Sequence, residues 1–168
     1  MINQNLSPVL YKFFLVKFVF MVIFGYKTVA MFDIWSLEHF INGICTAAVI
    51  NLLTKKASGK LEINSQSQKI IGFILVFTCA LFWECIEHYV EAGVIGGEIG
   101  ARVTHWFQGV EHWSNRLIGD TLTVMLGWIV YTLCKKLAVP AKIFSVIWLL
   151  VHIFIFPDSM YLHRVLFP

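Results

Sequence analysis

Long apolar runs separated by short polar stretches dominate the pattern of this chain. The runs cover residues 9–31, 37–53, 70–90, 117–134 and 141–156. A stretch of about 20 apolar residues is enough for a helix to cross the hydrocarbon core of a bilayer. The pattern therefore predicts an all-α fold, namely an integral membrane helical bundle with about five transmembrane helices.

The first run differs from the others because lysines interrupt it at Lys12, Lys17 and Lys27. A lysine near the end of a membrane helix can extend its ammonium group to the interface. Lys12 and Lys17 would then reach one interface and Lys27 the other. The alternative is a helix that lies along the membrane surface, which gives four spans plus an interfacial helix.

Lysines gather in the connections that follow the second and the fourth apolar runs. These lysines are Lys55, Lys56, Lys60 and Lys69, followed by Lys135, Lys136 and Lys142. Short cytoplasmic connections are enriched in lysine and arginine, whereas residues 91–116 contain two arginines and no lysine. We therefore expect residues 91–116 on the extracytoplasmic side and, if the first run spans, a cytoplasmic N-terminus.

Composition supports a single polytopic membrane domain over residues 1–168, since the chain is 58% hydrophobic and 14% charged. Soluble domains carry about 25% charged residues. The net charge of +3 arises mostly from the short connections, so it bears on orientation and does not indicate nucleic-acid binding. Membrane lipids are the expected surroundings, and the 15 Phe and 6 Trp leave apolar surface for membrane-protein partners or a homo-oligomer.

Ionisable residues recur beside the apolar runs. The dipeptide Glu-His occurs at Glu38-His39, Glu87-His88 and Glu111-His112, where composition alone gives about 0.25 occurrences by chance. In the expected orientation all three pairs lie at the extracytoplasmic end. Because ionisable groups are costly in or near a bilayer, their clustering indicates a functional site.

Three of the apolar segments also carry a polar stripe at helical spacing, which places its members on one helix face. The stripes consist of Glu84, Glu87, His88 and Glu91, of His39, Asn42, Gly43 and Thr46, and of Asp120, Thr123 and Gly127. Small and hydroxyl residues permit close approach of helices in a membrane. We therefore expect the three stripes to face one another around a polar cavity.

Carboxylates and imidazoles together are ligands for divalent transition metals such as Zn, Mn, Fe or Cu. The candidate metal ligands are His39, Glu84, Glu87 and His88. Clustered carboxylates also supply general acids and bases, so the candidate catalytic residues are Glu84, Glu87 and Asp120. Asp120 would be a further ligand or would orient an imidazole. The alternatives are a structural hydrogen-bonding role for Glu84 and Glu87, a position in the headgroup region for His39 and His88, and for Asp120 an acid at a helix N-terminus favoured by the helix dipole.

Three functions are compatible with such a site. The first is a metal-assisted enzyme that acts on a lipid or lipid-linked substrate. The second is a metal-ion or proton binding or transport protein, for which only Asn51, Thr54, Thr78 and Thr132 would extend a polar path toward the cytoplasm. The third is a non-catalytic subunit of a larger membrane complex. The sequence contains no HExxH, no Gly-x-Ser-x-Gly and no P-loop motif that would name the reaction.

Short motifs between residues 35 and 130 resemble those of a group of small, uncharacterised polytopic inner-membrane proteins, and more remotely the VanZ-like teicoplanin-resistance proteins. The motifs are Trp35-Ser36-x-x-His39-x-x-x-Gly43, Trp83-Glu84-x-x-Glu87 and Gly119-Asp120-Thr121-Leu122. The resemblance implies a location in a bacterial inner (cytoplasmic) membrane. It also implies that His39, Glu84, Glu87 and Asp120 form the site, and it implies no established activity.

Overall fold

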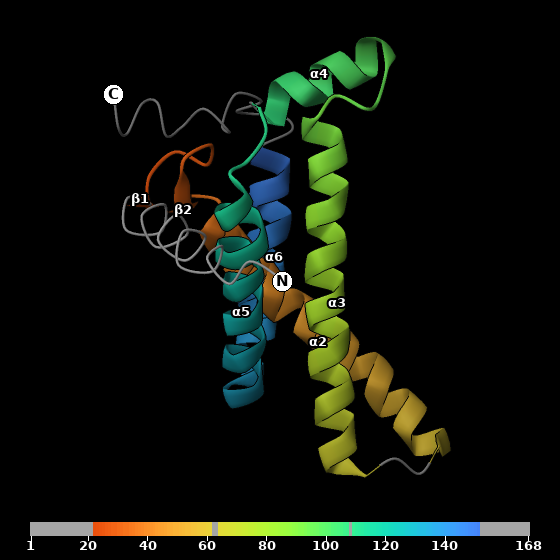
Figure 1. Cartoon of the computed structure of the whole chain (residues 1–168). Helices are drawn as coiled ribbons and strands as arrows, with labels where there is room; N and C mark the ends of the chain where they lie inside the picture. The colour runs from red at the N-terminus through yellow and green to blue at the C-terminus, as the bar shows by residue number, and fades with distance from the viewer. Residues whose placement is uncertain (1–21, 62–63, 108, 152–168) are drawn as a thin grey trace, which may run out of the picture.

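The structure is a computed structural model that describes residues 22–61, 64–107 and 109–151 (Figure 1). Most of the first predicted segment and the end of the fifth lie outside these residues. The elements are β1 (Val22–Phe24), β2 (Ala30–Phe32), α2 (Ser36–Leu61), α3 (Ser65–Glu91), α4 (Gly97–Phe107), the π-helix η1 (Asn115–Asp120), α5 (Thr121–Leu133), the 3-10 helix η2 (Lys135–Leu137) and α6 (Ala138–Leu150). The predicted helical class is confirmed.

Two of these helices are long and apolar enough to cross a membrane, over Ser36–Gly59 and Ser65–Glu91. The helices Asn115–Leu133 and Lys135–Leu150 meet at 118° and qualify together, which allows a third span. The short helix η2 joins them, and α5 and α6 each pack against α2. The count of five spans remains a prediction.

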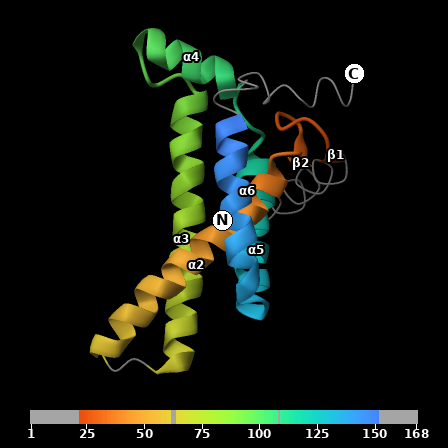
Figure 2. The same cartoon turned by 180° about the vertical axis from the view of Figure 1, so that it is seen from behind.

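The helix α2 crosses α3 and α5 obliquely, with α6 on its other side (Figures 1 and 2), and packs mainly against α5. Glycine permits this contact: a Cβ atom on Gly43 would lie 2.3 Å from the backbone oxygen of Val124, and one on Gly127 would lie 2.3 Å from the backbone oxygen of Phe40. The close approach predicted from these two glycines is confirmed. The close contact at Gly43 and Gly127 brings the polar residues at the start of α2 next to the start of α5.

The two lysine-rich connections lie at the same end of the molecule, as expected. A cavity of about 370 Å³ at this end is lined by Lys55, Lys69 and Lys135, which come from α2, α3 and η2. The connections between α2 and α3 and between α5 and α6 therefore share one side of the bundle. The acidic residues singled out from the sequence lie toward the opposite end.

Residues 22–31, predicted to complete the first helix, instead form two short strands and a turn. The strands pair in parallel, with Val22 opposite Ala30 and Phe24 opposite Phe32. The turn carries Lys27, whose side chain is 5% exposed and contacts Glu91 of α3. The interfacial position predicted for Lys27 is therefore wrong, because a buried carboxylate is available to pair with the ammonium group.

Candidate metal centre

The start of α2 is fixed by a local hydrogen-bonding arrangement. The Asp33 carboxylate accepts hydrogen bonds from the backbone N–H groups of Trp35 and Ser36, at 2.7 and 3.1 Å, and the Ser36 hydroxyl accepts from the backbone N–H of Asp33. This reciprocal capping satisfies donors that a helix start leaves without partners. The Ser36 hydroxyl also donates to Asp120 Oδ1 at 3.0 Å, so the cap of α2 holds the carboxylate that precedes α5.

The π-helix η1 presents the next group of side chains. Its residues Asn115, Arg116 and Asp120 are all buried, at no more than 7% exposure. A π-helical turn is wider than an α-helical turn and is frequent at functional sites. Asn115 donates to Asp33 Oδ2 at 3.2 Å, which ties η1 to the α2 cap. The wide turn thus lets one short segment direct an amide, a guanidinium and a carboxylate into the bundle.

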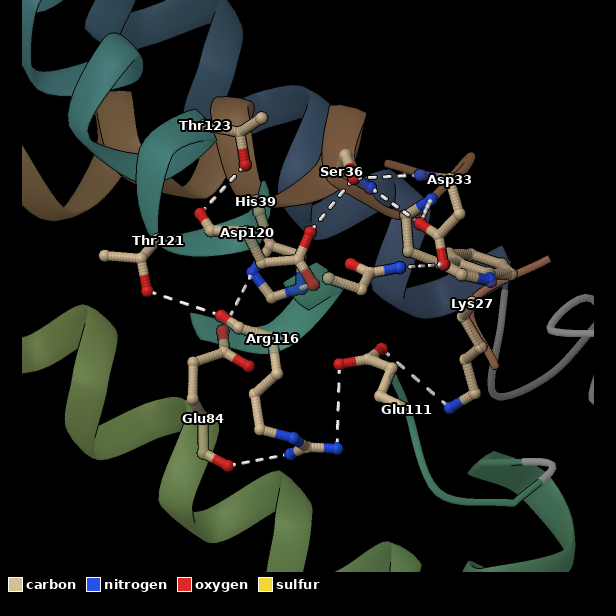
Figure 3. A network of polar contacts seen from close by, with 12 residues as sticks. Lys27, Asp33, Ser36, His39, Glu84, Glu111, Arg116, Asp120, Thr121 and Thr123 are labelled. Atoms are coloured by element: carbon tan, nitrogen blue, oxygen red, sulfur yellow. Dashed lines mark hydrogen bonds and ion pairs between the residues drawn. The ribbon is translucent and has the colours of Figure 1, made fainter. Parts of the chain in front are cut away.

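His39 lies between two carboxylates from different helices (Figure 3). Its Nδ1 is 3.7 Å from Glu84 Oε1 of α3, and its Nε2 is 3.7 Å from Asp120 Oδ2. One potential ligand atom of each of these three residues lies within 4.8 Å of the others. Ligands held about 2.0–2.2 Å from a common ion are separated by at most about 4.4 Å, so a small contraction would let all three coordinate one ion.

A second group of potential ligands shares Glu84 with the first. It consists of Glu84, Glu87 and Glu111, and one carboxylate oxygen of each residue lies within 4.8 Å of one oxygen of each of the other two. Glu84 and Glu87 come from adjacent turns of α3, whereas Glu111 comes from the connection before η1. The two groups together therefore join three segments that are far apart in the sequence.

Two cations border the carboxylates. Lys27 Nζ lies 2.5 Å from Glu91 Oε1, and Arg116 Nη2 contacts Glu91 Oε2 at short range. Both cations are farther from Glu111, at 4.0 and 3.6 Å. Arg116 Nη1 also donates to the backbone oxygen of Glu84 at 2.9 Å. Glu91 thus balances much of the cationic charge, and Arg116 holds the α3 backbone at Glu84.

Several carboxylate oxygens at the centre have no hydrogen-bond partner among the described residues. These are both oxygens of Glu84, Oε2 of Glu87, Oε2 of Glu111 and Oδ2 of Asp120. The side chains of Glu84 and Asp120 are 1% and 0% exposed. Buried carboxylates are normally hydrogen-bonded, paired or coordinated to a metal. Glu84 Oε1 and Asp120 Oδ2 each lie 3.7 Å from a His39 nitrogen, and Glu111 Oε2 lies 3.6 Å from Arg116 Nη2, so these oxygens have ion-pair contacts but no hydrogen bond among the described residues.

Outside the long helices, burial changes the acidity of two carboxyl groups. Burial and the nearby charge of Glu91 together raise the pKa of Glu111 to about 7, against the lowering effect of Lys27 and Arg116. Burial also raises the pKa of Asp33, against the lowering effect of its backbone hydrogen bonds. A carboxyl group that titrates near neutral pH is suited to general acid or base chemistry.

The structure brings together His39, Glu84, Glu87 and Asp120, all of which were singled out from the sequence. It places His88 elsewhere: this residue is exposed on α3, with its ring 6.4 Å from that of Tyr89, and it belongs to neither group of potential ligands. Glu87 and His88 are adjacent in the sequence. Successive residues point about 100° apart around a helix, so only one of the two is directed into the cluster.

Sequence reasoning did not include four of the residues that complete the site among the candidate ligands or catalytic groups, namely Lys27, Asp33, Glu111 and Arg116. The Glu111-His112 pair gave a signal, because it repeats the dipeptide found at Glu38-His39 and Glu87-His88. Arg116 also stood at the start of an apolar run. Asp33 had only a local signal, an acid three residues before Ser36 at the start of a helix. Their convergence depends on contacts between distant segments.

A cavity of about 390 Å³ opens beside the cluster. Glu87, Glu111 and His39 form part of its wall, and much of the rest is apolar, including Trp35, Trp83, Phe107, Val146 and Leu149. A second cavity of about 390 Å³ reaches Glu84 and His39 from the side of Cys79 and Val124. The carboxylates are therefore reachable from spaces with largely apolar walls.

Comparison with models of protein families, with curated proteins and with solved structures finds no match to this chain. The arrangement of residues within the fold is consequently the basis for the functional conclusions.

Proposed function

We propose that this chain is an integral protein of a bacterial inner membrane and that it works as a metal-assisted enzyme on a lipid or lipid-linked substrate. Its site would face the extracytoplasmic side. The observation that carries the proposal is the set of buried carboxylate oxygens on Glu84, Glu87, Glu111 and Asp120 without hydrogen-bond partners in the described part of the chain, next to His39.

Charge balance supports a cationic ligand. The cluster contains six carboxyl groups and two cationic side chains. The carboxyl groups are those of Asp33, Glu84, Glu87, Glu91, Glu111 and Asp120, and the cations are Lys27 and Arg116. Burying a charge without a partner is strongly unfavourable. A divalent ion would offset the excess negative charge and would coordinate the oxygens that lack donors.

The ligand chemistry fits a transition metal. His39 offers an imidazole nitrogen, while Glu84 and Asp120 offer carboxylate oxygens, a mixed set that suits Zn, Mn or Fe. When bound, such an ion would polarise a phosphoryl or carbonyl oxygen and lower the pKa of a coordinated water. In the metal-free protein burial raises the pKa of Glu111 to about 7, and a bound cation would hold this carboxylate deprotonated as a ligand.

The cavity beside Glu87 and Glu111 supports an amphiphilic substrate. Its carboxylate wall meets a wall containing Trp35, Trp83 and Leu149, so a polar group and an apolar chain would find matching surfaces. Binding sites commonly combine an apolar lining with a few placed polar groups. A lipid or lipid-linked molecule could approach with its head group at the cluster and its chain in the bilayer.

The packing between the two ends of the bundle favours an enzyme over a transporter. The described residues between the acidic cluster and the lysine-lined cavity include Ile44 and Ala47 on α2, Val76 on α3 and Val124 on α5, all of them buried and apolar. Asn51 and Thr54 lie beyond this layer. The Asn51 amide donates a hydrogen bond to the Tyr131 hydroxyl, and the Thr54 hydroxyl donates one to the backbone oxygen of Ile50. A continuous polar path would need side chains that this layer does not supply.

The test is the metal content of the detergent-purified protein, prepared without chelator and measured by elemental analysis. We expect stoichiometric metal in the wild type and a loss in Glu84→Gln. The matched control is Glu98→Gln, because Glu98 is an exposed acid on α4. A monodisperse elution profile would show that each variant is folded.

Activity is tested with the same proteins. Metal-loaded and metal-depleted wild type would be incubated with total membrane lipids, and the lipids compared by mass spectrometry. Conversion of a lipid species by the loaded wild type, and not by Glu84→Gln, is the expected result. Wild type without metal after chelator-free preparation and reconstitution would overturn the metal-assisted function. Full metal binding without any lipid conversion would overturn the enzymatic function.

A further inference from the structure

The carboxylate of Glu84 belongs to both groups of potential ligands, with His39 and Asp120 on one side and Glu87 and Glu111 on the other. We propose that this site holds two divalent cations and that the Glu84 carboxylate bridges them. The inference deepens the proposed function and rests on it. Two-metal sites with ions about 3.5–4 Å apart stabilise both the attacking and the leaving oxygen of a displacement.

Both oxygens of Glu84 are available for a bridge. Neither has a hydrogen-bond partner among the described residues, and the side chain is 1% exposed. A bridging carboxylate directs one oxygen to each ion. A carboxylate that served one ion through a single oxygen would leave the other buried without a partner, which is unfavourable.

Each side of Glu84 also carries its own unpartnered, buried oxygen. Asp120 Oδ2 is on the His39 side, and Glu87 Oε2 and Glu111 Oε2 are on the other. The side chains of Asp120 and Glu111 are 0% and 5% exposed. Glu111 Oε2 has an ion-pair contact with Arg116 at 3.6 Å, so a single ion on the His39 side would leave Glu87 Oε2 without any partner among the described residues.

The number of charges agrees with two ions. Lys27 and Arg116, which both contact Glu91, offset two of the six carboxylates of the cluster, so a charge equal to four carboxylates remains. Two divalent cations would balance four carboxylates. One ion would leave two negative charges buried at close range, where like charges resist joint ionisation.

The donor atoms point to manganese as a probe that suits both positions. The His39 side mixes nitrogen and oxygen, whereas the side of Glu87 and Glu111 offers only carboxylate oxygen. Oxygen donors suit Mg, Ca and Mn, and imidazole suits the transition metals. Mn²⁺ accepts both sets and is paramagnetic, so it also reports whether two ions are neighbours.

The experiment titrates metal-depleted, detergent-purified full-length protein with Mn²⁺. Bound metal is counted by elemental analysis after desalting, and the spectrum is recorded by electron paramagnetic resonance. We expect two Mn²⁺ per chain in the wild type, with an exchange-coupled spectrum that replaces the six-line signal of an isolated ion.

Variants on each side of the bridge separate the two positions. Glu87→Gln and Glu111→Gln should each retain one Mn²⁺ per chain with a six-line spectrum, because His39, Glu84 and Asp120 stay in place. Asp120→Asn should retain one ion on the opposite side. Glu84→Gln should bind neither at the same Mn²⁺ concentration. The exposed Glu98→Gln is the control and should bind two.

The outcomes distinguish this inference from the function on which it rests. One Mn²⁺ per chain in the wild type, with a six-line spectrum at saturation, would overturn the bridged pair and leave a mononuclear metal enzyme standing. No bound metal in a folded wild type would overturn both. Because Oε2 of Glu87 has no hydrogen-bond partner among the described residues, Glu87→Gln breaks no hydrogen bond at that oxygen. This variant therefore still tests the second position if Glu111→Gln fails to fold.

Discussion

The imidazole of His39 faces the carboxylate of Asp120 across the contact between α2 and α5, with Nε2 3.7 Å from Oδ2. The two side chains meet because Gly43 and Gly127 let the helix backbones approach closely just beyond them. Small residues at a helix crossing and polar residues at its end are thus parts of one arrangement. The glycines set the distance at which a ligand could be shared.

Replacing the imidazole tests this arrangement. In His39→Ala we expect the affinity for the ion between His39, Glu84 and Asp120 to fall by at least about 100-fold, since changes to groups that only support a ligand already reduce affinity about 10–100-fold. Isothermal titration with Mn²⁺ measures the effect. An unchanged affinity in the folded variant would exclude His39 as a ligand.

The glycine contact gives a prediction about stability. Gly127→Ala would place a Cβ atom 2.3 Å from the backbone oxygen of Phe40, so α2 and α5 must separate, at a loss of about 1–3 kcal/mol by analogy with overpacked cores. Gly59→Ala is the matched control, because no atom lies within 4 Å of its added Cβ. Thermal unfolding in detergent compares the two, and equal transition temperatures would contradict the close contact.

Glu91 is predicted to be structural. Glu91→Ala would leave Lys27 and Arg116 without their closest partner in a buried environment, and removing one member of a buried ion pair costs about 3–5 kcal/mol. We expect a large loss of stability, measured by thermal unfolding of the metal-depleted protein. The exposed Glu98→Ala should change it little. Similar stability in both variants would show that Glu91 does not balance the cations.

The acidity of Glu111 predicts a pH dependence. Its pKa is raised by burial to about 7, so between the ordinary value of 4.5 and about 7 the folded state binds the proton that the unfolded state releases. The contribution of Glu111 to stability is present below pH 4.5 and is lost as pH rises through about 7, at up to about 1.4 kcal/mol per pH unit.

Unfolding of metal-depleted wild type and Glu111→Gln between pH 5 and 8 measures this effect. We expect the wild type to lose stability with rising pH relative to the variant. Parallel profiles would mean that Glu111 does not titrate in this range. Metal is left out because bound cations would hold the carboxylates deprotonated.

The orientation can be tested from both sides of the membrane. In a background without the native cysteines, a cysteine at the exposed position Lys56 should react only with a reagent applied to the cytoplasmic side. One at Glu98, exposed on α4, should react only from the extracytoplasmic side. Labelling in oriented vesicles distinguishes the two. Reaction of both positions from one side would contradict the predicted placement.

The sequence by itself determined the helical class, the polar stripe of α3 and the small-residue face of α2. These features depend on hydropathy and on the helical repeat, which act over a few turns. For that reason Glu84, in one stripe with Glu87, His88 and Glu91, could be assigned to an inward face, and the structure buries Glu84 and Glu91.

Only the tertiary structure decided which polar groups meet. Lys27 reaches Glu91 across 64 positions and Ser36 reaches Asp120 across 84, and no local pattern encodes such pairs. Two short strands, Val22–Phe24 and Ala30–Phe32, stand in the region where hydropathy predicted a helix to residue 31. A buried lysine is tolerated only where a distant carboxylate meets it, so the packing of the whole chain, and not its local pattern, determined the composition of the site.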